Sequence, residues 1–314
     1  MKRVLAFLAK LTLSVGLLVY LLRSVDLADM WLHLEEGDHG LFALAALNYF
    51  VVVLLSTWRW QVLLEAVGGR ASFGDLTRSY MVSAFFANFL PSNIGGDLVR
   101  VKETAQSAGS TAASLAVAAL DRIVGFVGLY AIAVPAYALA GPLTRGLGGA
   151  QAILGGLTIV LASLGLFFER SDLVLALATA IGLPRLAWVW DRFVSLFEAV
   201  QALRRNRGAL FLALAQSVVL QFLGVLYFWM VARALRIPLD LGTSLVMVPL
   251  CTLIQAIPIS FNGWGLREGL YVFYFRQVGL RPESALAFSI VAASLVALLS
   301  VSGLFVWLAR RRPA

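Results

Sequence analysis

The stretch "IPISFNGWGLREG", residues 257–269, interrupts a long apolar part of the chain. Pro258 disfavours the helical conformation in the residue before it, so a helix is expected to end there. Ser260 or Asn262 is a good N-cap for a following helix. Three glycines loosen the backbone in the same stretch. The stretch therefore predicts two short helices separated by a break.

Composition places this break in a membrane protein. Of the 314 residues, 61% are hydrophobic and only 13% are charged, whereas soluble domains carry about 25% charged residues. The net charge of +8 could indicate a nucleic-acid partner, but the basic residues lie between apolar runs, as in the positive-inside pattern of membrane proteins. No nucleic-acid-binding module is recognisable, so no nucleic acid is expected as a partner.

Six apolar runs are long enough to cross a membrane, which takes about 20 residues. The sequence predicts an all-α, polytopic membrane protein, with one membrane domain over residues 1–314 and about six full spans. Trp58, Arg59 and Trp60 are interpreted as an interfacial anchor at the end of the second run. The predicted spans are residues 4–22, 41–58, 123–140, 150–168, 209–232 and 285–309.

Two further apolar segments, residues 76–120 and 243–278, are interrupted by proline and glycine. Each lies between two spans, and the two sets run in opposite orientations. Paired interruptions in two halves point to a transport site. We predict two re-entrant or broken helical hairpins related as an inverted repeat, with halves 41–140 and 209–309. Two unrelated re-entrant loops are the alternative.

The arginine distribution predicts the orientation in the membrane. Arginines cluster after the second span, within residues 172–207 and at the end of the chain, which favours the cytoplasm for these parts. Both termini are therefore expected in the cytoplasm and residues 26–39 outside. Residues 172–207 are interpreted as an amphipathic linker on the cytoplasmic interface between the two halves.

The stretch "LPSNIGGDLVRVKE", residues 90–103, contains the same kind of break between two helices as residues 257–269. Pro91 ends one helix, and Ser92 or Asn93 caps the next. The start of that helix offers free N–H groups and the positive end of its dipole, which bind anions. Arg100 follows one turn later, so we predict a phosphate-binding pocket. Its candidate residues are Asn93, Gly95, Gly96, Asp97 and Arg100.

The corresponding candidates in the second half are polar groups at the second break. Arg267 and Glu268 are adjacent, so on a helix they point about 100° apart and each is expected to find a partner elsewhere. The break would create a polar helix end inside the membrane and the charges would furnish a site. The candidates are Asn262, Gly263, Gly265, Arg267 and Glu268.

The motif "LDRIVG" places Asp121 and Arg122 near or within the third predicted span. Ionisable residues at membrane depth are costly and usually face a cavity or each other. Anchoring at the cytoplasmic interface is the alternative for this pair. Their candidate partners are the oppositely charged residues of the interrupted segments: Arg100 or Arg267 for Asp121, and Asp97 or Glu268 for Arg122.

The glycines of the interrupted segments are expected to matter most. If the backbone at residues 95–96 and 262–265 approaches a substrate, larger side chains would exclude it. Gly224 and Gly303 lie inside ordinary spans, and we expect them to tolerate a larger residue better.

In this order, "PSNIGGDLVR", "LDRIVG" and "PISFNGWGLREG" resemble the flippase-like integral membrane domain of bacterial lysylphosphatidylglycerol synthases and its stand-alone relatives. The resemblance covers nearly the whole chain. It implies translocation of a lipid or lipid-linked substrate in the cytoplasmic membrane of a bacterium. No soluble aminoacyl-transferase sequence follows the membrane domain, so synthase activity is not expected.

Three functions remain open at this stage. In a lipid translocase, Arg100, Arg122 and Arg267 would hold phosphate, while the acidic residues Asp97, Asp121 and Glu268 would be counter-charges or proton carriers. A membrane-embedded enzyme would use Asp97 or Glu268 as general base, although no catalytic motif is present. A scaffold for lipid synthesis is the third. Membrane lipids are the expected partners, with a lipid-biosynthesis enzyme and a homo-oligomer left open; no metal and no cofactor are expected.

Overall fold

The computed structural model describes residues 35–89, 95–139, 149–257 and 263–310. Within these ranges the regular elements are helices, with no strand. The described part has four helices long and apolar enough to cross a membrane. They are α3 (His39–Ala66), α6 (Thr111–Leu139), α11 (Arg207–Ala234) and α14 (Pro282–Arg310). The expected all-α, polytopic membrane fold is confirmed.

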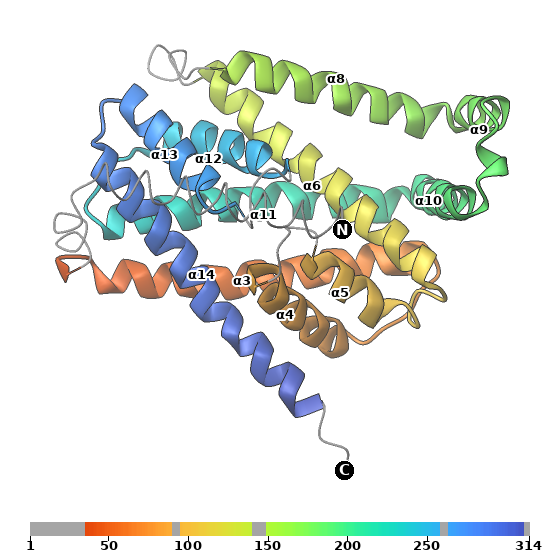
Figure 1. Ribbon diagram of the computed structural model, residues 1–314, viewed down its shortest axis with the longest axis horizontal. Coiled ribbons are helices and arrows are strands. Elements are labelled where there is room, and N and C mark those ends of the chain that lie inside the picture. Colours follow the sequence, from red (N-terminus) through yellow and green to blue (C-terminus); the bar gives the residue numbers. More distant parts are fainter. Residues whose placement is uncertain (1–34, 90–94, 140–148, 258–262, 311–314) are drawn as a thin grey trace, which may run out of the picture.

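The helices α3 and α11 lie side by side and run in opposite directions (Figure 1). The Asp38 backbone N–H donates to the Ala234 carbonyl oxygen over 2.8 Å, joining the start of α3 to the end of α11. Further along, the Asn48 amide donates to the Leu223 carbonyl oxygen over 2.9 Å. The Asp38 carboxylate also caps α3 by accepting from the Leu41 N–H. In an apolar environment each such polar group needs a partner within the protein.

Of the two remaining predicted spans, one lies within the described residues and one does not. Residues 150–168 form α8 (Ala150–Glu169), which lies along one edge of the bundle (Figure 1). Residues 4–22 lie outside the described residues. The number of membrane crossings therefore stays a prediction.

Each interrupted segment forms two short helices between two long ones. The first contains α4 (Phe73–Phe89) and α5 (Gly95–Thr104), between α3 and α6. The second contains α12 (Leu241–Gln255) and α13 (Leu266–Gln277), between α11 and α14. Both halves therefore have the same order of helix lengths: one long, two short and one long. The lengths are 28, 17, 10 and 29 residues in the first half and 28, 15, 12 and 29 in the second. The inverted repeat with halves 41–140 and 209–309 stays a prediction.

The segment between the halves forms α9 (Ser171–Ala180), a 3₁₀ turn (η1, Leu183–Arg185) and α10 (Ala187–Arg205). Figure 1 shows α9 and α10 end-on, across the direction of α3 and α11. Three buried residues of α10, namely Ala199, Val200 and Leu203, pack in one core cluster with Trp60 and Val117. The linker is thus also part of the core, and its place at the cytoplasmic interface stays a prediction.

Helix α14 lies very close to α4 at Gly303. A Cβ atom built there collides with the backbone carbonyl of Met81, so only glycine fits without movement. Gly96 is similarly crowded, with its Cβ position 2.6 Å from the Ala87 Cβ. The expectation that Gly303 tolerates larger residues is wrong, because this span packs directly on the first interrupted segment.

Alanine at Gly303 is expected to lower the free energy of unfolding by roughly 1–3 kcal/mol, the usual cost of overpacking. Gly224 is the matched control on another long helix, since no atom lies within 4 Å of its Cβ position. Gly224→Ala should stay within about 0.5 kcal/mol of the wild-type protein. Thermal unfolding in detergent compares the two variants. Equal melting temperatures would contradict the tight α4–α14 contact.

Candidate functional site

The centre of the candidate site is Asp121, which lies ten residues inside α6 and is only 6% exposed. Its Oδ1 atom accepts a hydrogen bond from Arg59 Nε of α3 over 2.8 Å. Arg59 also donates from Nη1 to the Ser217 hydroxyl of α11 over 2.9 Å. Small residues make room for this guanidinium, which lies 3.8 Å from the Cβ position of Gly125. Three helices therefore meet around one buried ion pair.

Arg100 of α5 is the second cation on the same carboxylate. Its Nη2 atom lies 3.3 Å from Asp121 Oδ2 and 3.0 Å from Asp97 Oδ1. The guanidinium carbon stacks 3.8 Å from the centre of the Trp60 ring. The Arg100 side chain is thus held from two sides while remaining 5% exposed. Such a planar cation is suited to bidentate recognition of phosphate.

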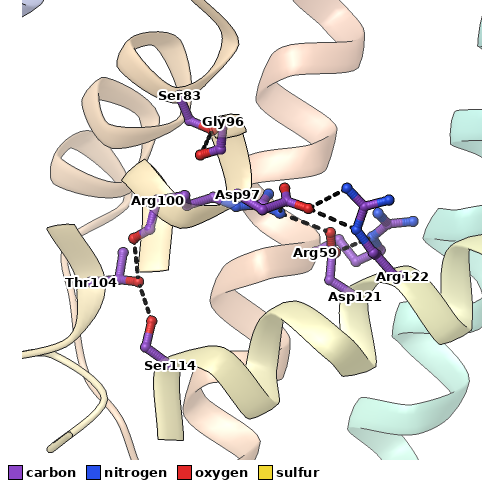
Figure 2. A network of polar contacts seen from close by, with 9 residues as sticks. All are labelled: Arg59, Ser83, Gly96, Asp97, Arg100, Thr104, Ser114, Asp121 and Arg122. Carbon is purple, nitrogen blue, oxygen red and sulfur yellow. Dashed lines mark hydrogen bonds and ion pairs between the residues drawn. The ribbon is translucent and has the colours of Figure 1, made fainter. Parts of the chain in front are cut away.

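Asp97 links a third arginine, Arg122, to Arg100 and Asp121. It accepts from Arg122 Nε over 2.7 Å while its other oxygen faces Arg100 (Figure 2). Three guanidinium groups against two carboxylates leave the set Arg59, Asp97, Arg100, Asp121 and Arg122 with one net positive charge. We call these five residues the arginine–aspartate cluster.

Several buried polar atoms in the described part of the chain have no hydrogen-bond partner. They include Arg100 Nε, Nε1 of the stacked Trp60, and the hydroxyl of Ser79. Ser79 lies one turn before Ser83, which donates to the Gly96 carbonyl oxygen of α5 over 2.6 Å. A buried polar group without a partner costs about 1–3 kcal/mol. Among them, Arg100 Nε belongs to a residue on a cavity wall and is therefore suited to receive a hydrogen-bonding ligand.

A cavity of about 300 Å³ opens beside the cluster between α3, α4, α5 and α14. Asp97 and Arg100 form its charged wall, and two tyrosines, Tyr49 and Tyr80, lie on its wall as well. Small-molecule pockets typically span about 300–1,000 Å³, so this one suits a headgroup rather than a whole lipid. The remaining lining residues are Val52, Val53, Ser83, Ala84, Ala87, Asn88, Gly96 and Val296.

A second ionic group lies at the start of α13. Glu268 is fully buried, and its Oε2 atom accepts from the Gly265 N–H over 2.6 Å. Its Oε1 atom accepts from Arg267 Nη2 over 2.7 Å and from the Ser289 hydroxyl of α14 over 3.1 Å. The Arg267 guanidinium carbon lies 4.7 Å from the centre of the Trp264 ring. We call Trp264, Arg267, Glu268 and Ser289 the α13 cluster.

The family described as the lysylphosphatidylglycerol synthase TM region matches residues 7–311. The chain belongs to this family. Membership ties this member of the lysylphosphatidylglycerol synthase TM family to a membrane lipid-related role. Searches of the curated proteins and of the solved structures give no match.

In this member of the lysylphosphatidylglycerol synthase TM family, the sequence-predicted residues fall into two groups. Asp97, Arg100, Asp121 and Arg122 contact one another, with Gly95 and Gly96 at the start of the same α5. Gly263, Gly265, Arg267 and Glu268 surround the start of α13. Asn93 and Asn262 lie outside the described residues.

The pairing predictions had mixed outcomes. Arg100 is a partner of Asp121, and Asp97 is the partner of Arg122, as expected. The expectation that Arg267 and Glu268 seek separate partners is wrong, because they pair directly. The reason is that Glu268 turns back so that its Oε2 atom caps Gly265 at the start of α13, and the long Arg267 side chain reaches the other oxygen, Oε1.

Sequence reasoning missed Arg59 as a site residue. Its interpretation as an interfacial anchor is wrong, because the residue is buried and paired with Asp121. The structure shows that the helix continues to Ala66, which places Arg59 almost two turns from its end. Trp60, Ser217 and the two cavity tyrosines were also missed, since aromatic and hydroxyl residues are common in apolar helices.

Proposed function

We propose that this protein translocates a lipid with an anionic or zwitterionic phosphate headgroup across the membrane. The headgroup would enter the cavity beside Arg100 while the acyl chains remain in the surrounding lipid. One observation carries the proposal: a buried arginine on a cavity wall keeps its Nε–H without a partner in the described residues. Phosphate oxygens accept from the Nε and Nη groups of arginine in a bidentate fork.

The neighbouring charges support a headgroup site rather than a purely structural ion pair. The arginine–aspartate cluster has an excess positive charge, which favours an anion over a cation. Asp97 and Asp121 already neutralise two of the three arginine charges. The remaining attraction would be strong enough to bind a phosphate group and weak enough to release it. Trp60 on one side of Arg100 fixes the orientation of the planar guanidinium. The lipid would cross without chemical change, so the proposal is for a translocase and not for an enzyme.

Purified protein in vesicles of phosphatidylethanolamine and phosphatidylglycerol tests translocation. A trace of phosphatidylglycerol carries nitrobenzoxadiazole on an acyl chain, and dithionite is added outside. Translocation exposes label from both leaflets, whereas empty vesicles lose only the outer share. Lipids extracted afterwards are weighed by mass spectrometry. Changed masses would indicate a membrane-embedded enzyme.

A reversible block of the cavity links the activity to this site. Val296 lines the cavity from α14 and is partly exposed, so Val296→Cys should react with a bulky methanethiosulfonate and lose translocation. Dithiothreitol should restore it. The unsubstituted protein is the control, because its single cysteine, Cys251, is fully buried.

We place the protein in the cytoplasmic membrane of a bacterium with both termini in the cytoplasm. In membranes of cells that make the protein, a cysteine at exposed Arg205 would then be labelled from the cytoplasmic side only.

The reconstituted vesicles address the remaining alternative. The assay is repeated with labelled phosphatidylglycerol, its lysyl ester and phosphatidylethanolamine. If the inner-leaflet label of each lipid stays as protected from dithionite as in empty vesicles, translocation is rejected and a scaffold for a lipid-biosynthesis enzyme is favoured.

A further inference from the structure

One face of α14 connects the α13 cluster to the cavity. Ser289 lies within hydrogen-bond distance of Arg267 and Glu268, at 3.2 and 3.1 Å. Ala292 accepts at its carbonyl oxygen from the Tyr227 hydroxyl over 2.6 Å. The third position, Val296, lines the cavity. Residues three and seven positions apart share a helix face, and seven residues span roughly 10 Å.

Three tyrosines from three other helices follow the same direction. Tyr80 of α4 lies under Arg100, with 5.1 Å between the guanidinium carbon and the ring centre. Tyr49 of α3 shares the cavity wall with Tyr80 and with Val296. Tyr227 of α11 donates to Ala292, one turn from Val296 on the same face of α14. A row of phenol groups therefore leads from the cavity beside Arg100 along α14 toward Ser289 and Arg267.

This row is chemically suited to a phosphate group in transit. A headgroup that leaves Arg100 through the apolar bundle would lose its hydrogen-bond donors, which is costly away from water. Phenol hydroxyls donate to phosphate oxygens without adding a charge that would hold them. The second arginine at the end of the row would then receive the same group.

We propose that the arginine–aspartate cluster and the α13 cluster are the two ends of one headgroup path, with Tyr49 as the step between them. This proposal rests on the proposed translocation function and specifies the route that the headgroup takes. The ligand is a phosphate ester headgroup. Its oxygens would accept hydrogen bonds first from Arg100, then from the tyrosine hydroxyls and finally from Arg267. Tyr49 is the position that decides passage, because it lines the cavity together with Tyr80 and Val296 and is not fully buried.

Tyr49→Phe and Tyr49→Trp separate passage from headgroup binding. Tyr49→Phe removes only the hydroxyl and should slow translocation about tenfold, the effect of one lost hydrogen bond to a charged group. Tyr49→Trp should abolish translocation by filling the cavity. Soluble dihexanoyl phosphatidylglycerol should still raise the melting temperature of Tyr49→Phe as it does for the wild type, because Arg100 is intact.

Tyr130→Phe is the matched control, a phenol on long helix α6 whose hydroxyl contacts Thr158 outside the row. It should translocate at the wild-type rate. Wild-type rates in both Tyr49 variants would overturn the path while leaving translocation standing. A wild-type protein that moves no lipid would overturn both. Loss of the lipid-induced melting shift in Tyr49→Phe would also overturn the role of Tyr49 as a step after binding.

Discussion

The Asp121→Asn substitution is expected to lower the free energy of unfolding by about 3–5 kcal/mol. Arg59 and Arg100 both direct guanidinium nitrogens at this carboxylate, and all three side chains are buried. Asparagine would leave two buried cations facing a neutral amide. Detergent-based equilibrium unfolding measures the loss.

A double substitution distinguishes the ion pair from simple damage to packing. Arg59→Gln in the Asp121→Asn background removes one uncompensated charge and should recover part of the lost stability. The control is Asp75→Asn, which breaks an exposed pair with Arg78 on α4 and should cost about 1 kcal/mol or less. Equal losses for Asp121→Asn and Asp75→Asn would contradict a buried electrostatic centre.

The Arg100→Lys substitution is expected to reduce translocation at least about tenfold while keeping the protein folded. Lysine retains the charge opposite Asp121, so the ion pair survives in part. It lacks the planar fork that binds two phosphate oxygens, and it lacks the flat surface that stacks on Trp60. The acyl-labelled phosphatidylglycerol assay measures the rate, and thermal unfolding measures the fold.

Arg78→Lys is the matched control for that change. It alters an arginine that also pairs with an aspartate three residues away, but whose side chain is exposed. Its translocation rate should equal that of the wild type. Undiminished rates in Arg100→Lys would show that Arg100 only supports the helix bundle and would remove the central residue of the proposed site.

Local chemistry in the sequence predicted much of the fold. Long apolar runs required spanning helices, because a chain in lipid must satisfy its backbone hydrogen bonds internally. Prolines and glycines between them predicted the two interruptions, and α4, α5, α12 and α13 confirm helices on both sides. The pairing of Asp121 with Arg100 was also predictable in kind, since each buried charge needs an opposite one nearby.

Other features depended on contacts between distant parts of the chain. Arg59 and Asp121 are 62 residues apart, and neither stretch contains a sign of the other. Their pairing arises because α3 and α6 meet where Gly125 and Ser217 leave space. Likewise, Gly303 looks like any small residue in a span until α4 lies against it.

The sequence by itself therefore determined that the protein is helical, membrane-embedded and broken at two polar segments, because these properties follow from hydropathy and backbone chemistry over short distances. Only the tertiary structure decided which arginine faces which aspartate and where the cavity opens. The same packing placed Tyr80 and Tyr49 on the cavity wall and Tyr227 against α14. The physical reason is that side chains from several helices can share one buried site only after those helices have packed.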